Sequence, residues 1–296
     1  MNSIKKMMLS GALGCLISGM AYADGSSPQP VKPYWQDIQV VAVNKEKPRS
    51  SFMSYADRET ALTSRFEKSP YYSLLNGTWK FFFVDSYKDL PQNITDPSVN
   101  TSSWDDITVP GNWEVQGHGV AIYTNHGYEF KPRNPQPPLL PEANPVGVYR
   151  RDIEIPASWD NRDIYLHIGG AKSGLYVYLN GKEVGYSEDS KNPAEFLINK
   201  YLQPGKNVLT LKIFRWSTGS YLECQDFWRM SGIERDVFLW SQPKASIQDF
   251  RVVSTLDDTY TNGIFKLAVD LKNHTQETKN LNVGYELLDA KGNLVT

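Results

Sequence analysis

Between residues 77 and 240, this chain carries a succession of short segments with β-strand character and almost no helical pattern between them. The segments either alternate apolar and polar residues or hold runs of β-branched and aromatic residues, as strands do. They span residues 77–84, 147–155, 162–168, 174–179, 206–214 and 234–240. Parallel strands need long crossover connections, which are usually helices. The pattern therefore predicts an all-β chain with antiparallel sheets packed as a sandwich, and it argues against a parallel α/β sheet.

One connection is short enough to predict its turn. Asn180 and Gly181 stand between the segments 174–179 and 182–187. Both residue types tolerate the positive φ angles that a type I′ turn requires. We therefore expect a tight hairpin here.

A second unit follows the sandwich. The segments 247–253, 263–271 and 281–289 have strand character and are typical of an immunoglobulin-like sandwich. Such a domain takes about 100 residues and seven strands, and residues 243–296 supply about half of that length. We interpret this region as a truncated immunoglobulin-like domain, and the chain as the front of a longer protein.

The amino terminus is typical of an export signal. Lys5 and Lys6 are followed by an apolar run over residues 7–20 and by a small-residue cleavage motif that ends at Ala23. The apolar run is too short and too rich in glycine for a membrane span. We expect cleavage of residues 1–23 and a periplasmic or secreted protein. A lipid anchor on Cys15 is the alternative.

The rest of the chain is predicted to divide into three parts. Residues 24–60 form an extended, proline-bearing arm, residues 61–242 form the sandwich, and residues 243–296 begin the second domain. Without the signal, 29 Lys and Arg stand against 33 Asp and Glu, a net charge of −4 that does not favour nucleic acid. With Cys224 as the sole remaining cysteine, the fold must be held by its core and not by disulfides.

Two long connections are where a binding site is expected. Residues 111–145 and 215–233 show no strand pattern and are rich in aromatic residues. Loops of this length in a compact domain are usually functional or disordered, and the aromatic content argues against disorder. No phosphate-binding loop, dinucleotide-binding glycine motif or helical histidine pair occurs, so no organic cofactor is expected.

Asp226 is the main candidate in the second connection. It precedes Phe227 and Trp228, whose rings are expected to desolvate it in part. A desolvated carboxylate needs a cation, hydroxyl groups or backbone donors. The residues alone leave a structural role and a binding role equally open. Glu223 lies close by in the sequence and forms an acidic cluster with it.

Four other residues have simpler explanations. For Glu188 and Asp189, a solvated turn or a loop-bracing carboxylate is favoured over catalysis. Asn125 could sort sugar hydroxyl groups because its amide both donates and accepts hydrogen bonds, although by itself a turn-fixing role is favoured. His167 alternates within a strand and is expected to pack there.

Five long motifs in register resemble the amino-terminal part of the large β-galactosidases of glycoside hydrolase family 2. They are LNGTWKF (75–81), VPGNWEVQGHGVAIYTN (109–125), NPVGVYRRDIEIP (144–156), LYVYLNGKEVGYSEDSKNPAEFLI (175–198) and RWSTGSYLECQDFWRMSGIERDV (215–237). The resemblance covers about residues 55–250. Several motifs in the same order are far more specific than any one of them.

The resemblance implies a fold and an activity. The fold is a galactose-binding-like jelly roll followed by an immunoglobulin-like domain and a catalytic (β/α)₈ barrel, which this chain lacks. The activity is that of a retaining β-galactosidase acting on terminal non-reducing β-D-galactose residues of β-D-galactosides. The two catalytic glutamates and the magnesium sites belong to the missing barrel. This chain by itself is therefore predicted to be inactive and to hold no catalytic residue.

The resemblance also implies that loops of the jelly roll complete the galactose pocket. It assigns substrate binding to Asn125 of the YTN motif and to Asp226 of the QDFW motif, with a sodium ion at Asp226. Where well-studied members carry an acid this chain has Cys224, so no role of that acid is transferred. The partners implied are the galactoside and the barrel, and a homo-oligomer of the full-length enzyme is compatible with the resemblance.

Two other functions stay open. A free-standing carbohydrate-binding sandwich without catalysis is motivated by the complete jelly roll and the absent glutamates. A structural adhesion sandwich would explain the strands but would leave Asn125 and Asp226 without a purpose.

Overall fold

The computed structural model describes residues 32–130, 136–223 and 226–295. The predicted signal 1–23, Cys15 and Cys224 lie outside these residues. The domain boundaries at residues 60 and 242 stay predictions. Among the described residues, no helix is both long enough and apolar enough to cross a bilayer.

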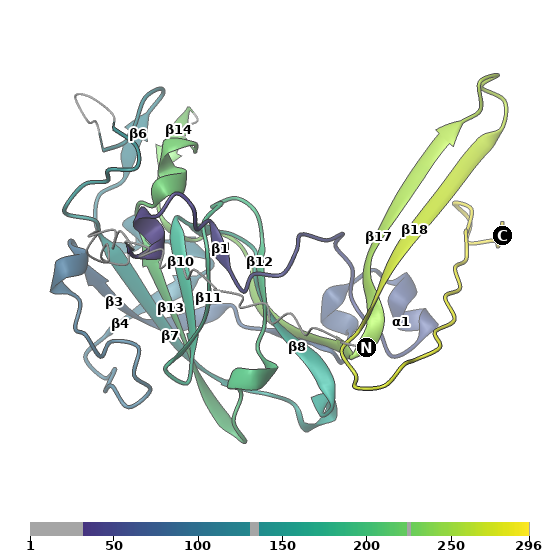
Figure 1. Cartoon of the computed structure of the whole chain (residues 1–296), viewed down its shortest axis with the longest axis horizontal. Coiled ribbons are helices and arrows are strands. Elements are labelled where there is room, and N and C mark those ends of the chain that lie inside the picture. The colour runs from purple at the N-terminus through teal and green to yellow at the C-terminus, as the bar shows by residue number, and fades with distance from the viewer. Residues whose placement is uncertain (1–31, 131–135, 224–225, 296) are drawn as a thin grey trace, which may run out of the picture. The chain divides into compact units, whose positions relative to one another are not determined.

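Two antiparallel sheets form the sandwich, which confirms the predicted all-β jelly roll (Figure 1). The larger sheet has the order β1-β11-β10-β13-β7-β3-β4, and the smaller has the order β12-β8-β16-β2. The strands are β1 (Ala42–Val43), β2 (Tyr72–Leu74), β3 (Gly77–Val84), β4 (Asp105–Val109), β7 (Val146–Glu154), β8 (Arg162–Ile168), β10 (Gly174–Leu179), β11 (Lys182–Ser187), β12 (Ala194–Leu197), β13 (Lys206–Phe214) and β16 (Val237–Pro243).

Alternation along the strands builds the core between the two sheets. Leu209, Leu211 and Ile213 are successive inward residues of β13. They share one buried cluster with Leu166 of β8 and Leu239 of β16. Burying a side chain of this size contributes about 1.5–3 kcal/mol, so this cluster is the main source of stability.

The amino-terminal arm packs against the outer faces of both sheets. Trp35, in the short helix η1 (Tyr34–Gln36), stacks on Phe214 of the larger sheet with ring centroids 4.9 Å apart. Further along, the Arg49 guanidinium lies 4.3 Å above the Trp240 ring and pairs with Glu195 at 2.9 Å on the smaller sheet. The arm thus covers apolar surface that the sandwich would otherwise expose.

Few helical segments interrupt the strands. Besides η1, and η4 (Glu114–Gln116) and η7 (Thr218–Tyr221) in the two long connections, they are α1 (Arg58–Leu62), η2 (Phe66–Lys68), η3 (Tyr87–Asp89), η5 (Ala157–Trp159) and η6 (Asn199–Tyr201). The α1 helix begins after Asp57, whose side chain accepts a hydrogen bond from the Thr60 backbone N–H as an N-cap.

The predicted β10–β11 hairpin is confirmed. Leu179 pairs with Lys182, and the two residues between them, Asn180 and Gly181, have φ angles of 53° and 77°. These positive values at both central positions are those of a type I′ turn.

Beyond the sandwich, β17 (Ala245–Leu256) and β18 (Gly263–Asn273) pair as a long antiparallel ribbon (Figure 1). The prediction of a strand over residues 281–289 is wrong, because only an isolated bridge between Leu288 and Leu294 occurs there. A strand is stable only where a neighbour takes up its backbone hydrogen bonds. In the described residues, segment 281–286 is paired with no strand, and the neighbouring Leu287 carbonyl accepts a single backbone hydrogen bond from Val295 at 2.7 Å.

Candidate functional site

The two long connections contain short strands, so the prediction that they hold none is wrong. The first carries β5 (Gly111–Asn112), η4 (Glu114–Gln116) and β6 (Ile122–Thr124), and the second carries η7 (Thr218–Tyr221), β14 (Phe227–Arg229) and β15 (Gly232–Ile233). β15 lies between β5 and β9 (Ala171–Lys172), and β14 pairs with β6. Strands of two or three residues are too short to show a periodic pattern.

β6 and β14 form a two-stranded ribbon at one end of the sandwich (Figure 1), which we call the site ribbon. Its strands are antiparallel, with Thr124 opposite Phe227. Asn125 directly follows β6, and Asp226 directly precedes β14. The register therefore brings these two predicted site residues to the same end of the ribbon, and both are exposed.

Two aromatic residues of the site ribbon, Tyr123 and Trp228, lie near Asp226. The Tyr123 hydroxyl donates a hydrogen bond to Asp226 Oδ1 at 2.9 Å. The Tyr123 and Trp228 rings are opposite each other, with centroids 5.7 Å apart, and remain 56% and 52% exposed. The hydrogen bond to Asp226, together with its negative charge, raises the pKa of Tyr123 because both disfavour the phenolate.

The expected desolvation of Asp226 is not found among the residues that the structure describes. Its carboxylate is exposed, and the neighbouring Trp228 is itself half exposed. Adjacent residues of a strand point to opposite faces, so aromatic neighbours in the sequence do not by themselves cover a carboxylate. Any cover for Asp226 must come from outside the described residues.

Asp226 offers limited coordination to a cation. Its Oδ1 atom already accepts the Tyr123 hydrogen bond. No group of three or more His, Cys, Asp or Glu side chains that could hold a metal ion occurs in the described part of the chain. The carboxylate fits the role of a single oxygen ligand for sodium, with further oxygen ligands needed from elsewhere.

Glu188 holds the start of the second connection, residues 218 and 219, through hydrogen bonds. Its buried carboxylate accepts hydrogen bonds from the hydroxyls of Tyr186 at 2.7 Å and Thr218 at 2.9 Å, and from the Gly219 backbone N–H at 2.6 Å. Burial raises the pKa of Glu188, and these hydrogen bonds oppose the rise. The favoured loop-bracing interpretation of Glu188 is confirmed, while Asp189 is exposed and accepts from Asn192.

Glu223 does not join Asp226 in an acidic pair. Its carboxylate accepts hydrogen bonds from the backbone N–H of Ser190 at 2.8 Å and from the Ser190 hydroxyl at 2.6 Å. It therefore ties the second connection to the loop after β11. His167 also packs as expected, with its ring 4.2 Å from that of Phe238 and its Nδ1 atom 2.8 Å from Glu195.

A buried cluster of charges lies beneath the site ribbon and was missed by the sequence reasoning. Glu114, Glu129, Lys172 and Arg215 each expose at most 5% of the side chain. Lys172 Nζ is 3.1 Å from Glu129, and Arg215 is 3.7 Å from Glu114 and 3.9 Å from Glu129. These residues are scattered over about 100 positions, and no local pattern indicates that they meet.

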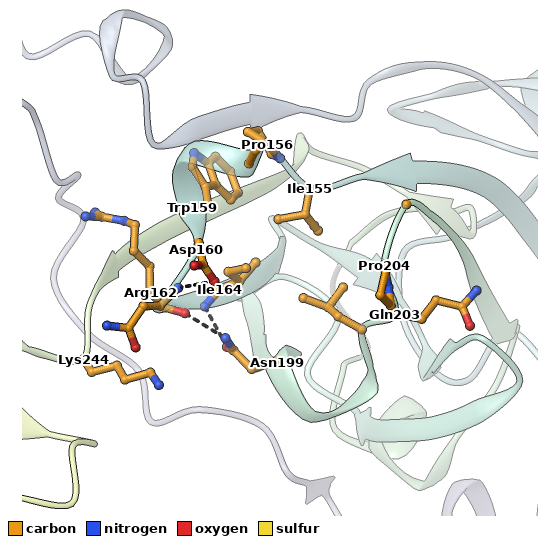
Figure 2. A pocket seen from close by; sticks show the side chains of 14 residues that line it. Ile155, Pro156, Trp159, Asp160, Arg162, Ile164, Asn199, Gln203, Pro204 and Lys244 are labelled. Carbon is orange, nitrogen blue, oxygen red and sulfur yellow. Dashed lines mark hydrogen bonds between the residues drawn. The ribbon is translucent and has the colours of Figure 1, made fainter.

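A broad depression of about 780 Å³ lies elsewhere on the sandwich (Figure 2). Several polar side chains that line it hold the backbone in place. In Figure 2, the Asn199 amide reaches the backbone of Arg162 and Ile164, at 2.7 and 2.8 Å. The Arg162 guanidinium donates to the hydroxyl and carbonyl oxygens of Ser241. Because these groups hold the backbone, the depression is a weaker candidate than the site ribbon.

Comparison with known proteins finds a family model, curated relatives and solved structures. Residues 72–243 match the family model described as "Glycosyl hydrolases family 2, sugar binding domain". The chain is 39% identical over 262 residues to a "Beta-galactosidase" of Priestia megaterium, covering 87% of this chain and 25% of that protein. It is 36% identical over 262 residues to a "Beta-galactosidase" of Psychromonas ingrahamii, covering 88% and 24%. The chain thus spans about a quarter of the length of these curated relatives.

Solved structures with the same fold include two β-glucuronidases. One, from an uncultured Clostridium species, superposes with a TM-score of 0.54 at 22% identity and covers 76% of this chain and 37% of that one. The other, from Bacteroides uniformis, gives a TM-score of 0.54 at 20% identity and covers 70% and 22%. At this identity the likeness shows the fold alone.

Proposed function

We propose that this chain supplies one wall of a galactose pocket. The premise is that it belongs to glycoside hydrolase family 2 and corresponds to the amino-terminal, sugar-binding region of the β-galactosidases of that family. The parent protein would be a retaining β-galactosidase that hydrolyses terminal non-reducing β-D-galactose residues. The identities of 39% and 36% to two β-galactosidases support galactose as the sugar.

The observation that carries this proposal is the register of the site ribbon. Asn125 and Asp226 come from two connections distant in the sequence, and both lie exposed at the same end of the site ribbon. An amide can both donate to and accept from sugar hydroxyls, and a carboxylate accepts from them or binds a cation. The exposed Tyr123 and Trp228 rings offer apolar faces against which a sugar ring can lie.

The remaining walls and the chemistry belong to the rest of the parent protein. Double displacement needs a nucleophile and an acid/base group about 5–5.5 Å apart, which we assign to the catalytic barrel. Magnesium would also be held there, and sodium would take the Asp226 carboxylate as one of its ligands. In the described residues, the site ribbon by itself is an open surface and encloses no sugar. We therefore expect this chain to bind sugar weakly.

The test is the activity of the protein encoded by the reading frame continued past Thr296. It should hydrolyse a chromogenic β-D-galactoside much faster than the matching β-D-glucuronide, while this chain alone should hydrolyse neither. A stop directly after Thr296, or measurable turnover by the 296-residue chain, would contradict the proposal.

A non-catalytic carbohydrate-binding module is the second candidate. It is supported by a complete sandwich core and by a family model whose description names sugar binding. Trp228 lies within the site ribbon, so its fluorescence reports on ligands there. Galactose titration of this chain should saturate at millimolar concentrations or below if it is a true module, and show weak or no binding if the site is shared.

We also propose export through residues 1–23. Fractionation of cells should find the mature protein in the periplasm or medium, with Asp24 as its first residue. A mature chain that is attached to lipid through Cys15 would favour the anchored alternative.

A further inference from the structure

A buried arginine, Arg215, bridges the two strands of the site ribbon at its base. Arg215 directly follows β13, and its side chain is 4% exposed. Its Nη2 atom donates hydrogen bonds to the carbonyl oxygen of Val120 at 2.9 Å and to that of Arg229 at 3.2 Å. Val120 precedes β6, and Arg229 is the last residue of β14. One guanidinium nitrogen therefore bridges the two strands where they leave the sandwich.

The charges around Arg215 fix it in place. Glu114, whose side chain is fully buried, lies 3.7 Å away and accepts hydrogen bonds from the backbone N–H of Ser231. Glu129 lies 3.9 Å away on the other side and pairs with Lys172 at 3.1 Å. Removing one member of such a buried set leaves an uncompensated charge, so the cluster favours one arrangement strongly.

The site ribbon needs such an anchor because it is small. Strands of three residues are marginal by themselves, and Tyr123 and Trp228 bury only about half of their surface. Apolar packing is therefore a weak constraint on how the strands lie. Asn125 and Asp226 are at the outer end of the same ladder, so their separation follows from the pairing that Arg215 fixes.

We propose that Arg215 is a positioning residue, which sets the alignment of the two ribbon strands and thereby the placement of Asn125 relative to Asp226. Arginine suits this role because its planar guanidinium directs several donors from one fixed group, whereas the lysine ammonium is a point charge on a flexible chain. The effect on sugar binding rests on the proposed function. The effect on the site ribbon does not.

The first experiment uses the 296-residue chain and the variant Arg215→Lys, which keeps the charge and loses the bridge. Amide hydrogen exchange in residues 122–124 and 227–229 should become at least about tenfold faster, while exchange in the β7–β13 ladder stays within about twofold. Arg162→Lys is the matched control, because Arg162 also donates to a backbone carbonyl but lies in β8 of the smaller sheet. It should leave amide exchange in the site ribbon unchanged.

A second readout separates positioning from a general loss of stability. Titration of ¹³C-labelled Tyr123 should show its pKa falling toward the ordinary value in Arg215→Lys, because the hydrogen bond to Asp226 depends on strand alignment. Unchanged ribbon exchange together with an unchanged Tyr123 titration would overturn the inference. Equal acceleration in the ribbon and in the β7–β13 ladder would also overturn it, since Arg215 would then act on the whole fold.

Turnover by the protein encoded past Thr296 distinguishes failure of this inference from failure of the proposed function. If both hold, Arg215→Lys and Asp226→Asn should each lower kcat/KM for a galactoside at least about tenfold, or about 1.4 kcal/mol. A loss in Asp226→Asn alone would overturn the positioning role. If neither variant changes turnover, the proposed function fails, while the exchange and titration results still decide the role of Arg215.

Discussion

The hydroxyl of Tyr123 donates a hydrogen bond of 2.9 Å to the carboxylate of Asp226, although the two residues are 103 positions apart in the sequence. This contact crosses the site ribbon and joins the two connections in which a site was expected. It shows that two separate connections of the sandwich meet at the candidate site.

The first prediction concerns the charge of Asp226. In Asp226→Asn the pKa of Tyr123 should fall, because its rise comes from the hydrogen bond to a negatively charged carboxylate. NMR titration of labelled Tyr123 measures this directly. Asp258→Asn, on an exposed turn far along the chain, should leave the titration unchanged. An unaltered Tyr123 pKa in Asp226→Asn would show that the contact is not formed in solution.

The second prediction concerns Glu188. Glu188→Ala leaves Tyr186, Thr218 and Gly219 without an acceptor, and should lower the free energy of unfolding by about 1–3 kcal/mol or more. Urea denaturation measures the loss. Asp189→Asn is the control and should change the free energy of unfolding by less than about 0.5 kcal/mol, because Asp189 is exposed and asparagine tolerates its positive φ angle. Equal effects of the two variants would contradict the bracing role.

The third prediction concerns the pH dependence of arm docking. Burial of Glu195 favours its neutral form, but the hydrogen bond from His167 and the charge of Arg49 outweigh this and lower its pKa below the ordinary 4.5. The ionised form therefore adds stability that is present above about pH 4.5 and is lost as pH falls through the folded-state pKa. Glu195→Gln should be less stable than wild type at pH 6, with a smaller difference at pH 3. Thermal unfolding at the two pH values tests this, and a constant difference would contradict it.

The fourth prediction concerns Gly232, in the strand that joins the bases of both connections. Its φ angle is +119°, and an added Cβ would lie 2.8 Å from the carbonyl oxygen of Gly111 and 3.0 Å from the Tyr149 hydroxyl. Gly232→Ala should therefore destabilise the fold by about 1–3 kcal/mol or more. Gly263→Ala meets no atom within 4 Å and serves as the control for urea denaturation. A neutral Gly232→Ala would show that the β5–β15 contact can relax.

The sequence allowed the longer strands to be predicted well. The bounds of β3, β8, β10 and β13 coincide with the predicted segments, because six to nine residues suffice to show alternation or a β-branched run. The Asn180–Gly181 turn was also predictable, since its φ angles depend on local chemistry. Such features are fixed by neighbouring residues.

Features that depend on distant residues were not predictable in the same way. The short strands β6 and β14 exist only because they pair with each other, with partners more than 100 positions apart in the sequence. The exposure of Asp226 and the meeting of Arg215 with Glu114 follow from the three-dimensional arrangement of the connections. Motif resemblance indicated Asn125 and Asp226 as partners, but it gave no indication of the charge cluster beneath them.

We propose that Asn125 and Asp226 form one wall of a galactoside pocket completed by the rest of the parent protein. The most direct test is kcat/KM for a chromogenic galactoside, measured on the protein encoded past Thr296 with Asn125→Ala, Asp226→Asn and the control Asp258→Asn. We expect losses of at least about tenfold for the first two variants and wild-type values for the control. Wild-type kcat/KM in both Asn125→Ala and Asp226→Asn would contradict it.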